Sequence, residues 1–254
     1  MKDILLRILK KSMPAPNVFI LELGADEPLP PIRCGQFLHL KVGGNYLLRR
    51  PFCIYKFTER TVTVVAAVVG GGTRCLAEQP EGACLQAVLP IGNGFTLEEK
   101  HRKIVLLGGG IGCAPLATVP VTYPDREYIS YLGFSTAENV LFEKEFSSFG
   151  KTVVATDDGT YGRSGFITDA LRADMAKISP DVILTCGPTP MLKAAARLSL
   201  ETKVPAYMSG ETRMGCGVGA CLVCACDIKE KNGEIVRKRA CVDGPVFRLE
   251  DIVL

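Results

Sequence analysis

The sequence predicts an α/β protein that also contains an all-β unit and a small cysteine-rich unit. Three observations carry this prediction. Short β-forming stretches separated by Gly and Pro fill the first hundred residues, and apolar strands alternate with helical stretches from about residue 103. Five cysteines then follow residue 215, and four of them form a spaced motif. We therefore expect an antiparallel barrel over residues 1–99, a doubly wound parallel sheet over 100–208 and a third unit over 209–254.

The barrel prediction depends on β-forming residues at 18–23, 36–42 and 61–69. Gly and Pro punctuate these stretches at 28–31, 43–44 and 70–72. Many short strands with a single short helix, expected at about 73–79, are typical of a small antiparallel barrel, here of six strands.

The second unit alternates strands and helices, which indicates a parallel sheet with helices on both faces. Its first helix is crowded by Pro115, Pro120 and Pro124, so we expect it to be short or broken. The last fifty residues should hold a cysteine loop and then a hairpin around 231–233. The expected strands are 103–107, 127–134, 152–156, 181–185 and 204–208, and the expected helices include 138–149, 167–178 and 190–201.

The most informative motif is C-x4-C-x2-C followed by sixteen residues and a fourth cysteine. This is the plant-ferredoxin spacing for a [2Fe–2S] cluster, whose two tetrahedral irons need four thiolates. Structural zinc and disulfides are the alternatives, but only one short Cys-x2-Cys knuckle is present. We do not expect Cys226 to be a ligand. The expected metal ligands are Cys216, Cys221, Cys224 and Cys241.

Composition narrows the class of protein. The 254 residues carry 30 basic and 27 acidic side chains, a net charge of +3 that is too small to argue for nucleic acid. The chain has eleven cysteines, but its N-terminus is broken by charge, unlike a secretory signal, and no apolar run is long enough to span a membrane. Free thiols and a cluster fit a reducing compartment, so we expect a cytoplasmic protein.

Two glycine-containing segments and one arginine pair are candidate phosphate sites. Arg49 and Arg50 precede Pro51, and a glycine run precedes Thr73 at the start of the short helix. A solvated strand edge and a plain glycine turn are the alternatives. A second glycine run, 108–112, follows an apolar strand, as in dinucleotide sites, although it is not a strict G-x-G-x-x-G. Cys186 ends another strand, where it is either near a ligand or simply a small buried residue.

Taken in order, these motifs resemble the ferredoxin–NADP reductase superfamily, and within it the electron-transfer subunits of the dihydroorotate dehydrogenase B family. The resemblance covers nearly the whole chain, and its most specific part is the run from Glu211 to Cys216, because few reductases carry a cluster loop behind the nucleotide domain. The motifs are 48–51, 72–73, 89–95, 107–115, 155–159, 186–188 and 211–216.

The resemblance implies sites for two further cofactors and no catalytic acid or base. FAD would be bound by Arg50, Pro51, Phe52, Cys53, Val65, Ala66, Ala67, Gly72 and Thr73, and NAD by Gly108, Gly109, Gly110, Gly112, Cys186 and Gly187. Two departures concern FAD: the family commonly has a hydroxyl residue at Cys53 and a basic residue near Ala67. NAD rather than NADP is expected, because no Arg stands beside 134–136 to hold a 2′-phosphate.

The resemblance also implies a function. A partner subunit holding FMN would oxidise dihydroorotate to orotate in pyrimidine biosynthesis, and electrons would pass through the cluster and FAD to NAD+. The expected assembly is a heterotetramer of two subunits of each kind. An alternative is a reductase subunit serving a sulfite, sulfide or ferredoxin oxidoreductase. A redox-sensing or zinc-bound module without turnover is a third reading.

Overall fold

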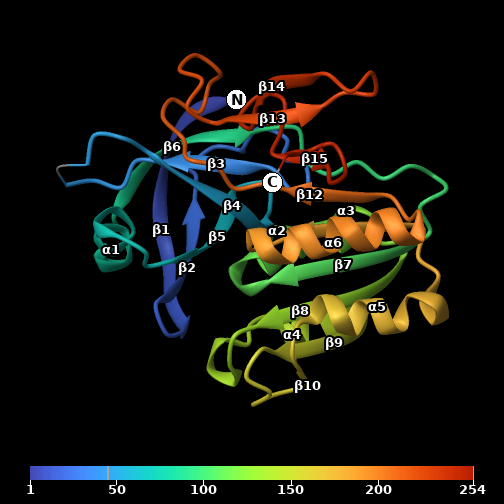
Figure 1. Cartoon of the computed structure of the whole chain (residues 1–254). Helices are drawn as coiled ribbons and strands as arrows, with labels where there is room; N and C mark the ends of the chain where they lie inside the picture. The colour runs from blue at the N-terminus through green and yellow to red at the C-terminus, as the bar shows by residue number, and fades with distance from the viewer. Residues whose placement is uncertain (45, 254) are drawn as a thin grey trace.

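The computed structural model describes residues 1–44 and 46–253. A closed barrel lies beside a layered α/β sheet, and the C-terminal segment crosses both (Figure 1). The fold class predicted from the sequence is confirmed.

The barrel has six antiparallel strands, as expected. Its strands are β1 (Lys2–Ala15), β2 (Val18–Gly24), β3 (Phe37–Leu40), β4 (Arg50–Phe57), β5 (Thr61–Ala67) and β6 (Cys84–Ile91), closed in the order β1-β2-β5-β4-β3-β6. Alternation of side chains places Leu38 and Leu40 in the barrel core. Helix α1 (Gly71–Glu78) follows β5 and starts two residues before the expected position.

The second sheet is parallel except at one edge, where β12 and β15 pair antiparallel. Its strands are β10 (Arg163–Ser164), β9 (Gly150–Thr156), β8 (Glu127–Phe134), β7 (Lys103–Gly109), β11 (Val182–Cys186), β12 (Ala206–Ser209) and β15 (Val246–Arg248), in that spatial order. Because side chains alternate, Ile104 and Leu106 pack on one face and Val105 and Leu107 on the other.

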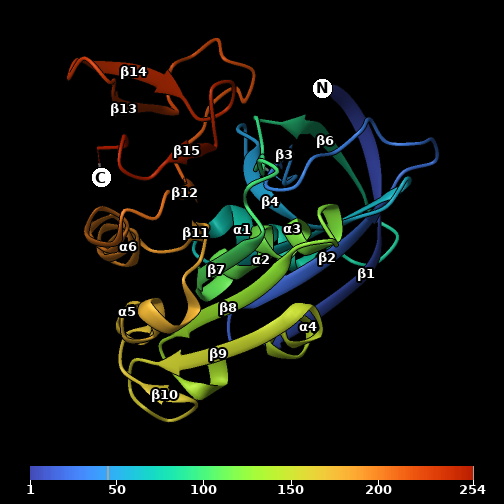
Figure 2. The same cartoon turned by 90° about the vertical axis from the view of Figure 1, so that its right-hand side faces the viewer.

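Helices cover both faces of this sheet, so it is doubly wound (Figure 2). The first helical segment is broken, as the prolines predict, into a 3₁₀ turn and two short helices. One face carries α2 (Cys113–Leu116), α3 (Thr118–Thr122) and α4 (Glu143–Phe149), and the other carries α5 (Ile167–Ile178) and α6 (Thr189–Thr202).

One helix prediction is too long. Instead of a helix over 138–149, the chain forms a 3₁₀ turn at Ala137–Asn139 and only then α4. Phe142 between them has a left-handed φ of 65°, which interrupts a continuous helix.

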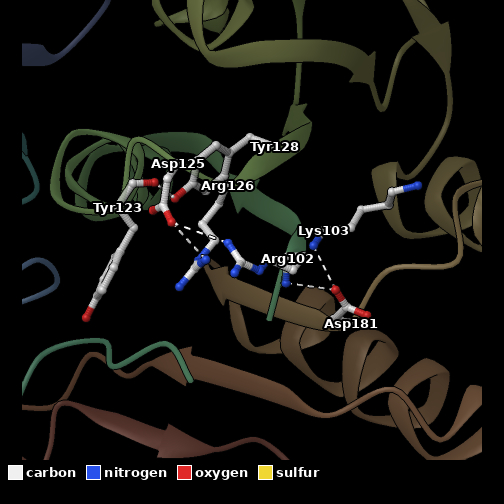
Figure 3. Close-up of polar contacts among 7 residues, drawn as sticks. All are labelled: Arg102, Lys103, Tyr123, Asp125, Arg126, Tyr128 and Asp181. Carbon is white, nitrogen blue, oxygen red and sulfur yellow. Dashed lines mark hydrogen bonds and ion pairs between the residues drawn. The ribbon is translucent and has the colours of Figure 1, made fainter. Parts of the chain in front are cut away.

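Asp181 links the central strands β7 and β11 at the end of the sheet where both strands begin. Its carboxylate accepts the backbone N–H groups of Arg102 and Lys103, both at 2.8 Å (Figure 3). These bonds, that to Lys103 first, lower the pKa of Asp181. On the next strand connection Arg126 pairs with Asp125 at 2.9 Å. The Asp181 bonds thus hold the start of β7 against the start of β11.

The C-terminal segment forms the expected hairpin, β13 (Ala225–Lys229) and β14 (Ile235–Arg239), and then returns as β15 to the sheet. Cys241 lies in a turn after β14 rather than on a return strand, because the ladder ends at Arg239. The division at residue 209 stays a prediction, and β15 shows that residues beyond it contribute to the sheet. In the described chain no helix combines the length and apolar character needed to cross a bilayer.

Candidate flavin pocket, nucleotide turn and cysteine loop

A pocket of about 280 Å³ lies where the barrel, the second sheet and the C-terminal segment meet. Eight of the nine residues predicted for FAD line it: Arg50, Pro51, Phe52, Cys53, Val65, Ala66, Ala67 and Thr73. The ninth, Gly72, lies against Arg50, since a Cβ on Gly72 would be 3.2 Å from the guanidinium Nε. The structure therefore brings the whole predicted set together.

One end of this pocket suits a phosphate. Thr73 Oγ1 accepts the N–H groups of Val69 at 2.9 Å and Gly70 at 3.2 Å, which shapes the first turn of α1. The bare backbone at Gly72 lets the Arg50 guanidinium approach this helix N-terminus. A fixed guanidinium beside free helix N–H groups is a favourable arrangement for an anion.

Two thiols and a carboxyl group, those of Cys53, Cys186 and Glu211, lie near one another at the pocket. Burial, with a smaller effect of Glu211, raises the pKa of Cys53 to about 12. Burial also raises the pKa of Cys186, and the neighbouring Cys53 and Glu211 add to this. Glu211 lines the pocket, and partial burial by the surrounding protein raises the pKa of its carboxyl group as well. Both thiols are therefore protonated near neutral pH.

The predicted nucleotide glycines lie at the carboxyl ends of two adjacent strands. Gly108 of β7 and Cys186 of β11 are register partners. A Cβ on Gly112 would lie 2.6 Å from the Cys186 carbonyl oxygen, and one on Gly187 would lie 3.0 Å from the Gly109 nitrogen. The chain runs from β7 outward through β8 and β9 on one side and later from β11 outward to β12 on the other, so the strand order reverses between β7 and β11, and ligands of open α/β sheets bind at such a point.

The four predicted cluster cysteines form two pairs. Cys224 Sγ and Cys241 Sγ are 3.2 Å apart and buried. Cys221 Sγ accepts the N–H of Cys216 at 3.3 Å, and this second pair is more accessible. Two thiolate pairs match the needs of a dinuclear cluster, with one pair for each tetrahedral iron.

Two backbone N–H groups of the cysteine loop point at the sulfur of Cys216. Cys216 Sγ accepts N–H groups from Val218 at 3.4 Å and Ala220 at 3.3 Å. These bonds, that from Val218 first, lower the pKa of Cys216 to about 6. Among the described residues no three Cys, His, Asp or Glu side chains converge on one point.

Cys226 is hydrogen-bonded within the hairpin. It lies on β13, and its thiol donates to the Lys238 carbonyl of β14 at 3.5 Å. Burial raises its pKa to about 11. A protonated thiol bonded inside the hairpin agrees with the expectation that Cys226 is not a ligand.

The pocket and the inner cysteine pair share a wall. Phe37 lines the pocket and also packs against Cys224 and Cys241. Met214 and Ala240 likewise belong to both sides of this wall. The pocket is therefore separated from the inner thiolates by a single layer of side chains.

Sequence reasoning missed several pocket residues. Thr212 is one of them, and its buried Oγ1 has no hydrogen-bond partner within the described residues, which suits a polar ligand. A signal existed for Glu211, Thr212 and Met214, which belong to the recognised run before the cluster loop. Alternation along β3 pointed Phe37 away from the barrel core. The missed lining residues are Phe37, Val69, Ile111, Pro115, Gly210, Glu211, Thr212, Met214, Ala240 and Pro245.

Comparison with known protein families agrees with the family resemblance seen in the sequence motifs. Residues 211–253 match the family described as the iron-sulfur cluster binding domain of dihydroorotate dehydrogenase B. The electron transfer subunit of dihydroorotate dehydrogenase B (NAD(+)) from Bacillus velezensis is 42% identical over 228 residues, 87% of each chain. That from Bacillus pumilus is 36% identical and covers 100% of this chain and 99% of its own.

Solved structures agree with the fold. A structure of NADH-dependent reduced ferredoxin-NADP oxidoreductase superposes with a TM-score of 0.87 at 28% identity, covering 98% of this chain and 89% of that one. Phthalate dioxygenase reductase has a TM-score of 0.66 at 20% identity, covering 94% and 77%, and supports the fold alone.

Proposed function

Because the chain belongs to the family of electron-transfer subunits of dihydroorotate dehydrogenase B, we propose that it carries electrons between a dihydroorotate-oxidising partner and NAD+. The single observation that carries this proposal is the wall of Phe37, Met214 and Ala240, shared by the flavin pocket and the inner cysteine pair.

The cofactors are FAD, a [2Fe–2S] cluster and NAD. When bound, the cluster exchanges single electrons and FAD exchanges both single electrons and a hydride, so the pair connects one-electron chemistry with nicotinamide. The residues of this chain bind and orient these groups, and none has to act as an acid or base.

The barrel holds FAD. Arg50 and the start of α1 at Gly72 and Thr73 bind the pyrophosphate, and the orphaned Thr212 hydroxyl supplies a further polar contact. Phe52 and Cys53, with the strand residues Val65, Ala66 and Ala67, line the part of the pocket that fits the flavin ring. The Cys53 thiol, kept protonated by burial, is a weaker hydrogen-bond partner than a hydroxyl.

The second sheet holds NAD at the glycine turn. Gly108, Gly109, Gly110 and Gly112 leave the backbone bare, so phosphates can approach the N–H groups there. Cys186 and Gly187 end β11 beside this turn and beside Cys53, which orients the nicotinamide toward the flavin pocket. The buried thiols of Cys53 and Cys186, whose pKa values are raised by burial, would border the nicotinamide there.

The loop cysteines hold the cluster in two layers. Cys224 and Cys241 form the inner, buried pair against the flavin wall, and Cys216 and Cys221 form the outer pair. The side chains around the outer pair are apolar and exposed: Val218 by 47%, Leu222 by 60% and Val223 by 54%. An exposed apolar rim around a redox centre fits a surface on which the catalytic partner docks.

The finer assembly is also part of the proposal. The partner holds FMN, and two copies of each subunit form a heterotetramer. The apolar rim supports one partner contact for each copy of this chain. The mass of the complex purified from its native host tests the stoichiometry.

The function is tested by mixing the protein with its native catalytic partner. Two reactions are followed: dihydroorotate-dependent reduction of NAD+, and NADH-dependent reduction of an artificial acceptor. Cys221→Ser should lose the first and keep the second, because the second needs only the barrel and nucleotide turn. Cys84→Ser, at an exposed thiol on the barrel, should keep both.

Retained FAD is measured first in every variant, so that misfolding is recognised. If Cys221→Ser keeps both reactions, the cluster is structural and the proposal fails. If the wild-type mixture reduces NAD+ with another electron donor but never with dihydroorotate, the chain serves a different partner. The 0.87 TM-score to a ferredoxin-linked enzyme makes reduced ferredoxin the first donor to test in that case.

A further inference from the structure

His39 is a fully buried polar residue that the proposed function does not use. It lies on β3, where Leu38 and Leu40 face the barrel core and Phe37 faces the C-terminal unit. The period of two along a strand puts His39 on the same outward face as Phe37. Its exposed fraction is nevertheless 0%. The outward face of β3 is therefore covered at this point, and the cover is the cluster loop.

The contact with the loop is close. A Cβ on Gly217 would lie 2.6 Å from His39 Nδ1, so only the bare backbone of glycine fits against the ring. Gly217 also has a φ of +72°, which favours glycine independently. The backbone of Cys216 lies against the same ring. The imidazole thus contacts the turn that carries an outer cluster ligand.

The other side of the ring faces the flavin half of the molecule. The backbone of Arg49, which precedes Arg50 at the start of β4, lies against it. His39 is also the register partner of Pro51 on β4 and of Val88 on β6. One imidazole therefore touches both the strand start that holds FAD and the turn that holds the cluster.

Neither ring nitrogen completes a well-formed hydrogen bond within the described residues, and the backbone groups within reach of the ring belong to Arg49 and Cys216. Burying an imidazole costs free energy unless its nitrogens are hydrogen-bonded. An apolar side chain would fill the same position at a lower cost in folding free energy. An imidazole carries at least one N–H donor in either protonation state. That donor is in contact with the loop in which N–H groups already converge on Cys216 Sγ.

We propose that His39 is a positioning residue for the cluster, whose N–H holds the Cys216–Gly217 turn and thereby stabilises the reduced cluster. The inference rests on the proposed function in one respect, the assignment of the four cysteines to the cluster. Hydrogen bonds around cluster sulfurs raise the reduction potential, because the reduced cluster carries more negative charge. A residue of the FAD-binding barrel therefore sets the potential of a cluster held by another part of the chain.

The test compares His39→Leu, His39→Asn and Val88→Ala in the full protein. Leu keeps the apolar volume and removes the N–H, whereas Asn keeps an N–H donor. Val88→Ala is the matched control, since Val88 is the cross-strand neighbour of His39 and packs against the apolar side chains around Phe37. The midpoint potential of the cluster is measured by redox titration with electron paramagnetic resonance, and that of FAD by absorbance in the same samples.

At a fixed ambient potential, His39→Leu should lower the ratio of reduced to oxidised cluster about tenfold, which for one electron corresponds to about 59 mV. His39→Asn should recover most of this loss, and Val88→Ala should leave the ratio unchanged. The FAD potential should not move in any variant. An unchanged cluster potential in His39→Leu, or an equal shift in Val88→Ala, overturns the proposal.

Loss of the cluster has a defined meaning as well. If His39→Leu cannot retain it but His39→Asn does so with the wild-type spectrum, the proposal is supported. If both variants lose the cluster while keeping FAD, the loop requires the shape of the imidazole and not its N–H, and the proposal is overturned. A wild-type protein without any cluster spectrum would instead contradict the proposed function, so the two failures are distinct.

Discussion

Asn93 pairs with Val246 through its side chain as a neighbouring strand would through its backbone. Its Nδ2 donates to the Val246 carbonyl at 2.8 Å, and its Oδ1 accepts the Val246 N–H at 3.0 Å. Nδ2 also donates to the Asp243 carbonyl at 3.1 Å. Asn93, two residues after the last barrel strand, therefore clamps the segment between the cluster ligand Cys241 and β15.

The first prediction concerns this clamp. Asn93→Ala removes three hydrogen bonds, of which the two to Val246 are partly buried, and should lower the free energy of unfolding by about 2–3 kcal/mol. Chemical denaturation of the purified protein measures the change. Asn232→Ala is the matched control, because Asn232 bonds only within the exposed hairpin turn, and it should cost at most about 1 kcal/mol. Equal losses in the two variants would show that Asn93 is not a special clamp.

The second prediction separates two neighbouring cysteines. Cys226→Ser should preserve the visible spectrum of the cluster, since the Cys226 thiol bonds to Lys238 inside the hairpin. Cys241→Ser should bleach or strongly shift it, because Cys241 pairs with Cys224 at 3.2 Å. Absorbance and the iron content per protein are the measurements. The reverse pattern would show that the fourth ligand has been misassigned.

The third prediction addresses the wall between the flavin pocket and the cluster. Phe37→Leu should leave reduction of the flavin by NADH unchanged and slow the subsequent reduction of the cluster several-fold, because the layer between them becomes less densely packed. Stopped-flow absorbance resolves the two steps. Phe37 is only 4% exposed, so Phe37→Ala should also destabilise the protein by about 3–5 kcal/mol.

Leu192→Ala provides the control for a general loss of stability. Leu192 packs on the face of the second sheet that points away from the barrel. It should lower stability while leaving both kinetic steps as they are. Cluster reduction at the wild-type rate in Phe37→Leu would mean that electrons take a route that avoids this wall.

The fourth prediction uses the contrast between two thiols after removal of the cluster. The pKa of Cys216 is lowered to about 6, mainly by the N–H of Val218, so its reactive thiolate is half formed at that pH and predominates at neutral pH. Its alkylation by iodoacetamide should rise as the pH rises through 6 and then level off. The pKa of Cys53 is raised to about 12, so Cys53 should stay largely unmodified at neutral pH. Peptide mass spectrometry across pH 5–9 reads both sites, and a Cys216 rate still climbing at pH 9 would contradict the assignment.

Patterns among neighbouring residues of the sequence were enough to predict the cluster motif and most of the secondary structure. The spacing of Cys216, Cys221 and Cys224 follows from the reach of one loop around two irons, and such a signal is contained in neighbouring residues. The same holds for the barrel strands and for the alternation of strands with helices, because side-chain period and turn residues are local properties. The broken first helix was predictable since proline acts on its own turn.

What the tertiary structure alone decided are the contacts between segments far apart in the chain. The outward face of β3 could be read as alternating, but only packing shows that Phe37 meets Cys224 and that His39 meets Gly217. Nothing local to Asn93 indicates a partner 153 positions away. The left-handed Phe142 that shortens α4 was likewise invisible to the sequence pattern. Such contacts depend on how whole elements pack, and a periodic pattern specifies which face is buried without specifying what buries it.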